Sequence, residues 1–310
     1  MTTRLEHLIR PAVGTAPGVQ TRHRSVGYTV AVVGLLAAMV SFIANLVAVG
    51  LVNSGNTQLA NQTLAWNFGL NTAAFGTIKL AIAIVLTGIL VRLWLRVEGV
   101  KQALAELKPA AQRNLSIGET ISPYGKATSS KEVPGPLAIH TMAKKVWAPM
   151  MAMGYMAVLV GLIISFGWAA DPSDVTLASW TQGIQFLGEG FLLAGISFLL
   201  GTILASLREG GGEVQATLGL TVKTMRMPAT AKVFVAFMML GVMVSMLQFV
   251  LYLVVAGGVA NPEAWFAWLG PLREAGLGLI LTGVVLALVT IGNVLGFQFD
   301  RIKEIIRTGN

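Results

Sequence analysis

The chain has 310 residues, of which 55% are hydrophobic and only 12% are charged. A soluble globular domain carries roughly a quarter charged residues, so this composition excludes a protein that covers its whole surface with polar groups in water. The chain has a formal net charge of +8 and no cysteine, which excludes disulfide bonds and thiolate chemistry.

Six apolar segments predict an all-α integral membrane bundle of six transmembrane helices. Five of them contain no charged residue and the sixth, 71–92, is interrupted by Lys79; the others are 28–52, 146–170, 190–207, 233–262 and 275–299. Each is near or above the ~20 residues that a helix needs to cross about 30 Å of hydrocarbon. Their continuous apolar character favours helices over the alternating strands of a membrane barrel.

The seven tryptophans support these boundaries, because all lie at the edge of a predicted span or just outside it. They are Trp66, Trp94, Trp147, Trp168, Trp180, Trp265 and Trp268. Indole rings prefer the membrane–water interface, so this distribution indicates an aromatic belt.

The distribution of basic residues predicts the orientation. The N-terminal segment, the second and fourth connections and the C-terminal tail hold 20 of the 22 lysines and arginines, against 9 of the 14 acidic residues. Lys79 and Arg273 are the two exceptions. The positive-inside rule therefore places both termini in the cytoplasm. The basic character has a membrane explanation and does not indicate nucleic-acid binding.

The predicted organisation has seven parts. They are a cytoplasmic N-terminal segment (1–27), a first transmembrane hairpin (28–92), a cytoplasmic connection with an amphipathic helix and a mobile loop (93–145), a second hairpin (146–207), a cytoplasmic connection (208–232), a third hairpin (233–299) and a cytoplasmic tail (300–310).

Short sequence resemblances suggest that the three hairpins are tandem repeats. The first helices share 39–42 (MVSF), 163–166 (IISF) and 243–246 (MVSM). All three units have the same orientation, unlike the inverted repeats of many secondary transporters. Membrane helices draw on few residue types, so chance similarity is the competing explanation.

The cytoplasmic segments carry amphipathic patterns. The second connection begins with Val97, Val100, Leu104 and Leu107 at helical spacing, and becomes rich in Gly, Pro, Ser and Thr after Ser116, which predicts an extended or mobile loop. In the fourth connection, 210–212 (GGG) predicts a flexible joint before a helix with Val214, Leu218, Val222 and Met225 on one face. Such segments either lie on the anionic inner leaflet or dock a cytoplasmic partner.

Three ionisable residues in or near the spans form a candidate polar cluster: Lys79, Glu189 and Glu274. Counted from the tryptophans of their hairpins, they fall on about the same helix face. If their helices meet, one lysine and two carboxylates converge in an outward-facing vestibule that suits an ion or a proton. The competing interpretation is that charges at helix ends are interfacial anchors.

Uncharged polar residues lie deeper in the spans: Ser41, Asn45, Ser165, Ser245, Gln248 and Asn293. Hydrogen bonds between helices are the simplest role for them, each worth about 1 kcal/mol. A polar path through the bundle is the alternative.

The sequence holds no recognisable catalytic motif, and its three histidines, His7, His23 and His140, fall in the predicted cytoplasmic segments. We therefore expect no enzyme activity, no cofactor and no metal. The leading hypothesis is a non-catalytic subunit, anchor or assembly factor of a complex in the plasma membrane. Its partners are then the lipid bilayer and other membrane proteins or further copies of the chain. The alternative is a transporter or channel for a small or largely apolar solute.

Overall fold

A computed structural model describes residues 17–105, 119–122, 125–130, 133, 135, 138–226 and 228–308. Its helices are α2 (Pro17–Asn53), α3 (Thr57–Ala105), α4 (Ala138–Ala170), α5 (Val175–Thr217), α6 (Ala229–Ala256) and α7 (Pro262–Thr308). All six are long and apolar enough to cross a membrane, which confirms the six predicted helices.

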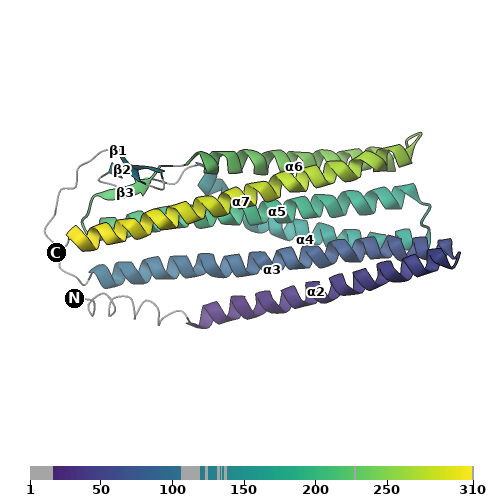
Figure 1. The fold of residues 1–310 in the computed structure, drawn as a ribbon, viewed down its shortest axis with the longest axis horizontal. Helices are drawn as coiled ribbons and strands as arrows, with labels where there is room; N and C mark the ends of the chain where they lie inside the picture. The colour runs from purple at the N-terminus through teal and green to yellow at the C-terminus, as the bar shows by residue number, and fades with distance from the viewer. Residues whose placement is uncertain are drawn as a thin grey trace.

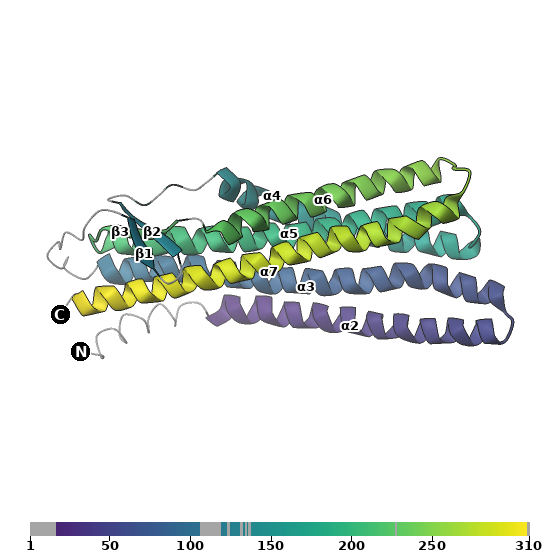
Figure 2. The same cartoon turned by 45° about the horizontal axis from the view of Figure 1, so that its top comes forward.

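Consecutive helices pack side by side, α2 with α3, α4 with α5 and α6 with α7. Short connections at 54–56, 171–174 and 257–261 join the partners, and all three lie at one end of the bundle, here called the turn end (Figure 1). The C-terminal end of α7 and a small β-sheet lie at the opposite end, here called the sheet end (Figures 1 and 2).

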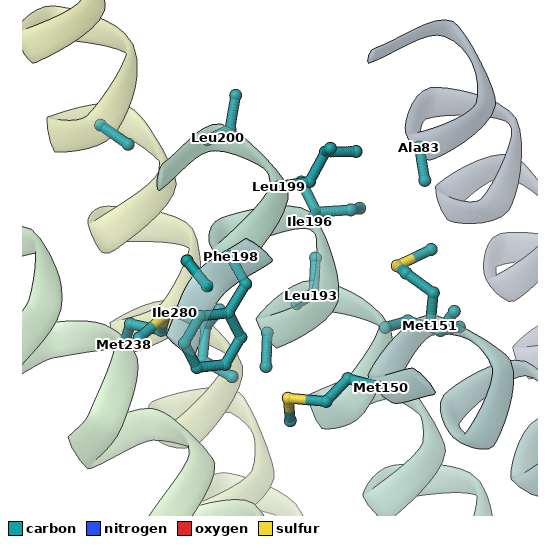
Figure 3. Packing of buried hydrophobic residues seen from close by; sticks show 14 of the residues in the cluster. Ala83, Met150, Met151, Leu193, Ile196, Phe198, Leu199, Leu200, Met238 and Ile280 are labelled. Carbon is teal, nitrogen blue, oxygen red and sulfur yellow. The ribbon is translucent and has the colours of Figure 1, made fainter. Parts of the chain in front are cut away.

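Helix α5 forms the centre of the bundle, since it packs against α3, α4, α6 and α7. Its apolar side chains point to several sides, with Leu193, Ile196 and Phe198 surrounded by residues of the neighbouring helices (Figure 3). Leu192 and Leu199 are fully buried. A central helix that is apolar all round is what this position requires, because it has no face left for water or lipid.

Glycines bring the backbones of paired helices into direct contact. A Cβ atom added to Gly154 of α4 would lie 2.7 Å from the Leu192 nitrogen and 2.8 Å from the Gly188 oxygen of α5. The same kind of contact joins Gly34 of α2 to the Ala74 oxygen and Gly241 of α6 to the Gly276 oxygen. Small residues at such crossings allow the close van der Waals packing that holds membrane helices together.

The predicted flexible joint at 210–212 is wrong, because α5 continues through these residues to Thr217. Successive residues of a helix point about 100° apart, so the three glycines face three different neighbours. An added Cβ at Gly210 would meet Val97 of α3, at Gly211 Gln298 of α7, and at Gly212 Val133 and Val222. The triplet is a site of close packing on three sides of α5.

Parts of the segments predicted to be an extended or mobile loop and a helical face form a three-stranded antiparallel sheet, and most of the rest of the loop lies outside the described residues. The strands of the sheet are β1 (Glu119–Ser122), β2 (Gly125–Ser130) and β3 (Val222–Met225). Ser122 pairs with Gly125 where β1 turns into β2. The predicted helical face through Val222 and Met225 is wrong because α5 ends at Thr217 and Gly219 follows with a φ of +69°, a conformation that suits glycine and reverses the chain.

The predicted amphipathic helix of the second connection is the continuation of α3, which runs unbroken to Ala105. Val97, Val100 and Leu104 belong to it, whereas Leu107 lies outside the described residues. Helices α3, α5 and α7 thus all extend toward the sheet end beyond the start of α4 and α6 (Figure 1). We call this extension, together with the sheet, the stalk.

Candidate functional site: a buried ion cluster

Glu189 lies deep in the bundle, with 3% of its surface exposed. It follows the first residue of α5 by fourteen positions, which is about 21 Å at 1.5 Å per residue. The charge-free run begins at Gly190, so the sequence suggested a position at the membrane surface. Because α5 already begins at Val175, the Glu189 carboxylate lies well inside the helix bundle instead.

Two cations from different helices hold the Glu189 carboxylate. Lys79 of α3 donates from Nζ to Oε1 at 2.7 Å. Arg273 of α7 donates to Oε2 from Nη2 at 2.6 Å and from Nε at 3.2 Å. The central helix is therefore tied to α3 and α7 by charge-assisted hydrogen bonds, which are about twice as strong as neutral ones.

The structure brings Lys79 and Glu189 together but leaves Glu274 outside the contact. The Glu274 side chain is 73% exposed and reaches the cluster through Arg273, with its Oε1 atom 3.5 Å from Nη1. Positions 273 and 274 point about 100° apart on α7, so only one of them faces α5. The second carboxylate of the expected vestibule is thus replaced by a guanidinium.

Arg273 is the member of this cluster that sequence reasoning missed. Its guanidinium carbon lies 4.1 Å from the ring centroid of Phe186, one turn before Glu189 on α5, a cation–π contact that also fixes its direction. The available signal was its isolation, since Arg273 and Lys79 are the only two basic residues in the segments facing away from the basic side. A buried carboxylate needs such partners.

Two cations and one carboxylate leave the cluster with a formal surplus of one positive charge. Burying a charge is costly unless it is paired, and losing one partner leaves an uncompensated charge. Lys79 and Arg273 keep 18% and 24% of their side-chain surfaces exposed, whereas Glu189 keeps 4%. The cations therefore retain partial solvation, and the carboxylate depends on them. Such an arrangement can lock three helices together or hold an anion or a proton.

Three of the other predicted polar residues make hydrogen bonds inside the bundle. Ser165 and Ser245 donate to carbonyls of their own helices, those of Leu162 and Gly241. Gln248 of α6 donates from Nε2 to the Leu269 carbonyl of α7 at 3.0 Å. All three side chains are nearly inaccessible, so they contribute to packing between helices.

The remaining three candidates do not meet at one place. Ser41 is buried on α2, and Asn293 is half-buried on α7. Asn45 is exposed on α2 and lines a cavity between α2, α3 and the end of α4. Ser41 and Asn45 are about one turn apart on α2, whereas Asn293 lies on another helix.

Fold and surface together define the class of the chain. Six long apolar helices pack into one bundle, and large apolar side chains such as Phe42 and Ile163 are exposed on its outside by 63% and 69%. This arrangement fits a multi-pass membrane protein with lipid around the bundle. No protein-family model matches the chain, and no curated protein or solved structure is significantly similar to it.

Proposed function

We propose that the chain is a non-catalytic scaffold subunit of a membrane complex, which anchors a partner through its stalk. The observation that carries the proposal is the length of α3, α5 and α7. Ten residues of α5 follow Leu207, an extension of about 15 Å. Charged residues return toward this end of all three helices, at Arg92 of α3, Arg208 of α5 and Asp300 of α7.

A polar network makes the stalk a defined surface. Gln215 of α5 is buried and donates from Nε2 to the carbonyls of Gly211 and Lys223, while its Oε1 accepts from the Lys223 nitrogen. Arg301 of α7 donates from Nε to Gln215 Oε1 at 3.0 Å and from Nη2 to the Thr221 carbonyl at 3.2 Å. Buried hydrogen-bonded networks favour one arrangement of the elements that they join, as a docking surface requires.

The proposal includes the orientation and the repeat. The bundle spans the plasma membrane, and both termini and the stalk lie on its cytoplasmic side, because the positive-inside rule assigns the basic segments to that side. The three hairpins are tandem units, and the matching glycine contacts at Gly34, Gly154 and Gly241 support this. Further copies of the chain are an alternative partner.

The test is a pull-down of the tagged full chain in mild detergent, analysed by native mass spectrometry. We expect stoichiometric partners with the wild type and their loss with Gln215→Leu, which keeps the volume but removes the network. Gln182→Leu is the matched control, because Gln182 is also on α5 and hydrogen-bonded, to Tyr252 near the turn end. A wild-type chain that purifies alone as a monomer would refute the scaffold role.

A transporter or channel for a small or largely apolar solute is the second candidate, and the buried ion cluster favours it. Intramembrane charges often mark ion and proton pathways. Under this alternative, flux into liposomes falls when Lys79 or Glu189 is neutralised while the protein remains folded. Flux that is unchanged in both variants would exclude the cluster from transport.

A further inference from the structure

A cavity of about 500 Å³ lies near the turn end. Its volume is within the ~300–1,000 Å³ typical of small-molecule sites. Helix α3 supplies most of the wall, at positions spaced three and four residues apart, and α2 and the last turn of α4 complete it. The polar lining consists of four asparagines, Asn45, Asn61, Asn67 and Asn71.

Asn67 is the residue that points to a ligand. Its side chain is 2% exposed, and its Oδ1 atom has no hydrogen-bond partner among the described residues. An unsatisfied buried acceptor costs about 1–3 kcal/mol, so this position is destabilising unless a donor enters the cavity. A hydroxyl group supplies such a donor.

The apolar part of the wall is aromatic and held in place. Phe68 and Trp168 meet edge to face, with ring centroids 6.2 Å apart. The Trp168 indole donates from Nε1 to the Pro172 carbonyl at 3.2 Å. The indole nitrogen is thus already used, and the rings offer apolar surface to a ligand.

We propose that this cavity binds an uncharged, hydroxyl-rich group, namely a glycosyl headgroup of a lipid or a free sugar of the same chemistry. Neutral amides both donate and accept, which matches hydroxyl groups, while the residues lining the cavity include no charged side chain to bind an ion. The aromatic wall fits the C–H face of a sugar ring. The site lies beside exposed apolar residues of α2 and α3, such as Leu46 and Leu64, where acyl chains can pack.

The test uses the full chain purified in a polyoxyethylene detergent, because detergents with sugar headgroups would compete for the site. Native mass spectrometry then measures retention of diglucosyl diacylglycerol, with phosphatidylcholine and phosphatidylglycerol of the same acyl chains as comparisons. Free maltose forms a separate arm. The variant is Asn67→Leu, and Asn293→Leu on α7 is the control with the same chemical change.

We expect the wild type and Asn293→Leu to retain the glycolipid or maltose, and Asn67→Leu to bind about tenfold more weakly, the effect of roughly one hydrogen bond. Retention of the lipid alone identifies a headgroup site, and binding of maltose identifies a soluble ligand. Asn67→Leu should unfold at the wild-type temperature or above when no ligand is present, since it removes an unpaired acceptor. Equal binding by Asn67→Leu, equal retention of the charged lipids, or no binding of either sugar probe would overturn the proposal.

Discussion

At the scale of single residues, the ion cluster is asymmetric, because one buried carboxylate binds two less buried cations. Lys79 and Arg273 approach Glu189 from opposite neighbours of α5 and share its two oxygens. Removing the Glu189 carboxylate leaves Lys79 without its counter-charge and Arg273 with the exposed Glu274 alone, whereas removing either cation leaves a complete pair. The three positions are therefore not equivalent.

We predict that Glu189→Gln costs the most stability, about 3–5 kcal/mol for a broken buried pair. Lys79→Met should cost less, because Arg273 still neutralises Glu189, and the exposed Glu274→Gln should change stability by no more than about 0.5 kcal/mol. Thermal unfolding in detergent measures this order.

A double-mutant cycle tests whether Lys79 and Glu189 interact directly. Adding Lys79→Met to Glu189→Gln removes one of the two repelling cations, so the double variant should be more stable than Glu189→Gln alone. Strict additivity of the two substitutions would contradict a direct contact between them.

At the scale of helices and strands, the sequence predicted the spans well because the absence of charge over ~20 residues is a strong signal. It failed at the sheet end, where charges reappear along helices that do not stop. Helices α3, α5 and α7 continue there because they pack on one another, for instance through Gly210 and Val97. Strands β1 and β2 are only four and six residues long and show no alternation of apolar residues, so no periodicity marked them.

The candidate site was predictable only in part, because counting along the sequence does not give the rotation of each helix. Counting from tryptophans placed Lys79, Glu189 and Glu274 on about the same helix face, but no count distinguishes Arg273 from Glu274 without the rotation of α7. The repeat signal has the same weakness. Ser41 lies seven residues after Gly34, whereas Ser165 lies eleven after Gly154 and Ser245 four after Gly241, so the serine motifs and the glycine contacts give alignments of the hairpins that differ by one to two turns.

The helix contacts predict that glycine-to-alanine substitutions change stability in opposite directions at two positions. Gly154→Ala should destabilise the protein, because its methyl group would collide with the backbone of α5 at Gly188 and Leu192. Gly278→Ala on α7 meets nothing within 4 Å and should stabilise by about 0.5–1 kcal/mol, the difference in helix propensity. Thermal unfolding of both variants checks the signs, and a neutral Gly154→Ala would contradict the close α4–α5 crossing.

At the scale of the whole molecule, the charge distribution and the fold divide the chain in the same way. The segments with 20 of the 22 basic residues lead into the sheet end, and the three connections at the turn end contain no lysine or arginine. Insertion retains basic segments in the cytoplasm. We therefore expect the stalk and the proposed partner surface on the cytoplasmic side, and the asparagine-lined cavity in the outer half of the bundle.

The lack of cysteine makes this orientation directly measurable, because each introduced thiol is unique. Ser54 and Ser173 are exposed in connections at the turn end, and Thr128 is exposed on β2 at the sheet end. We expect a membrane-impermeant maleimide to label Ser54→Cys and Ser173→Cys in intact cells, and Thr128→Cys only after permeabilisation. The reverse pattern would place the stalk outside and remove the cytoplasmic partner. Labelling at both ends in intact cells would mean a mixed orientation, which the basic asymmetry of this chain should prevent.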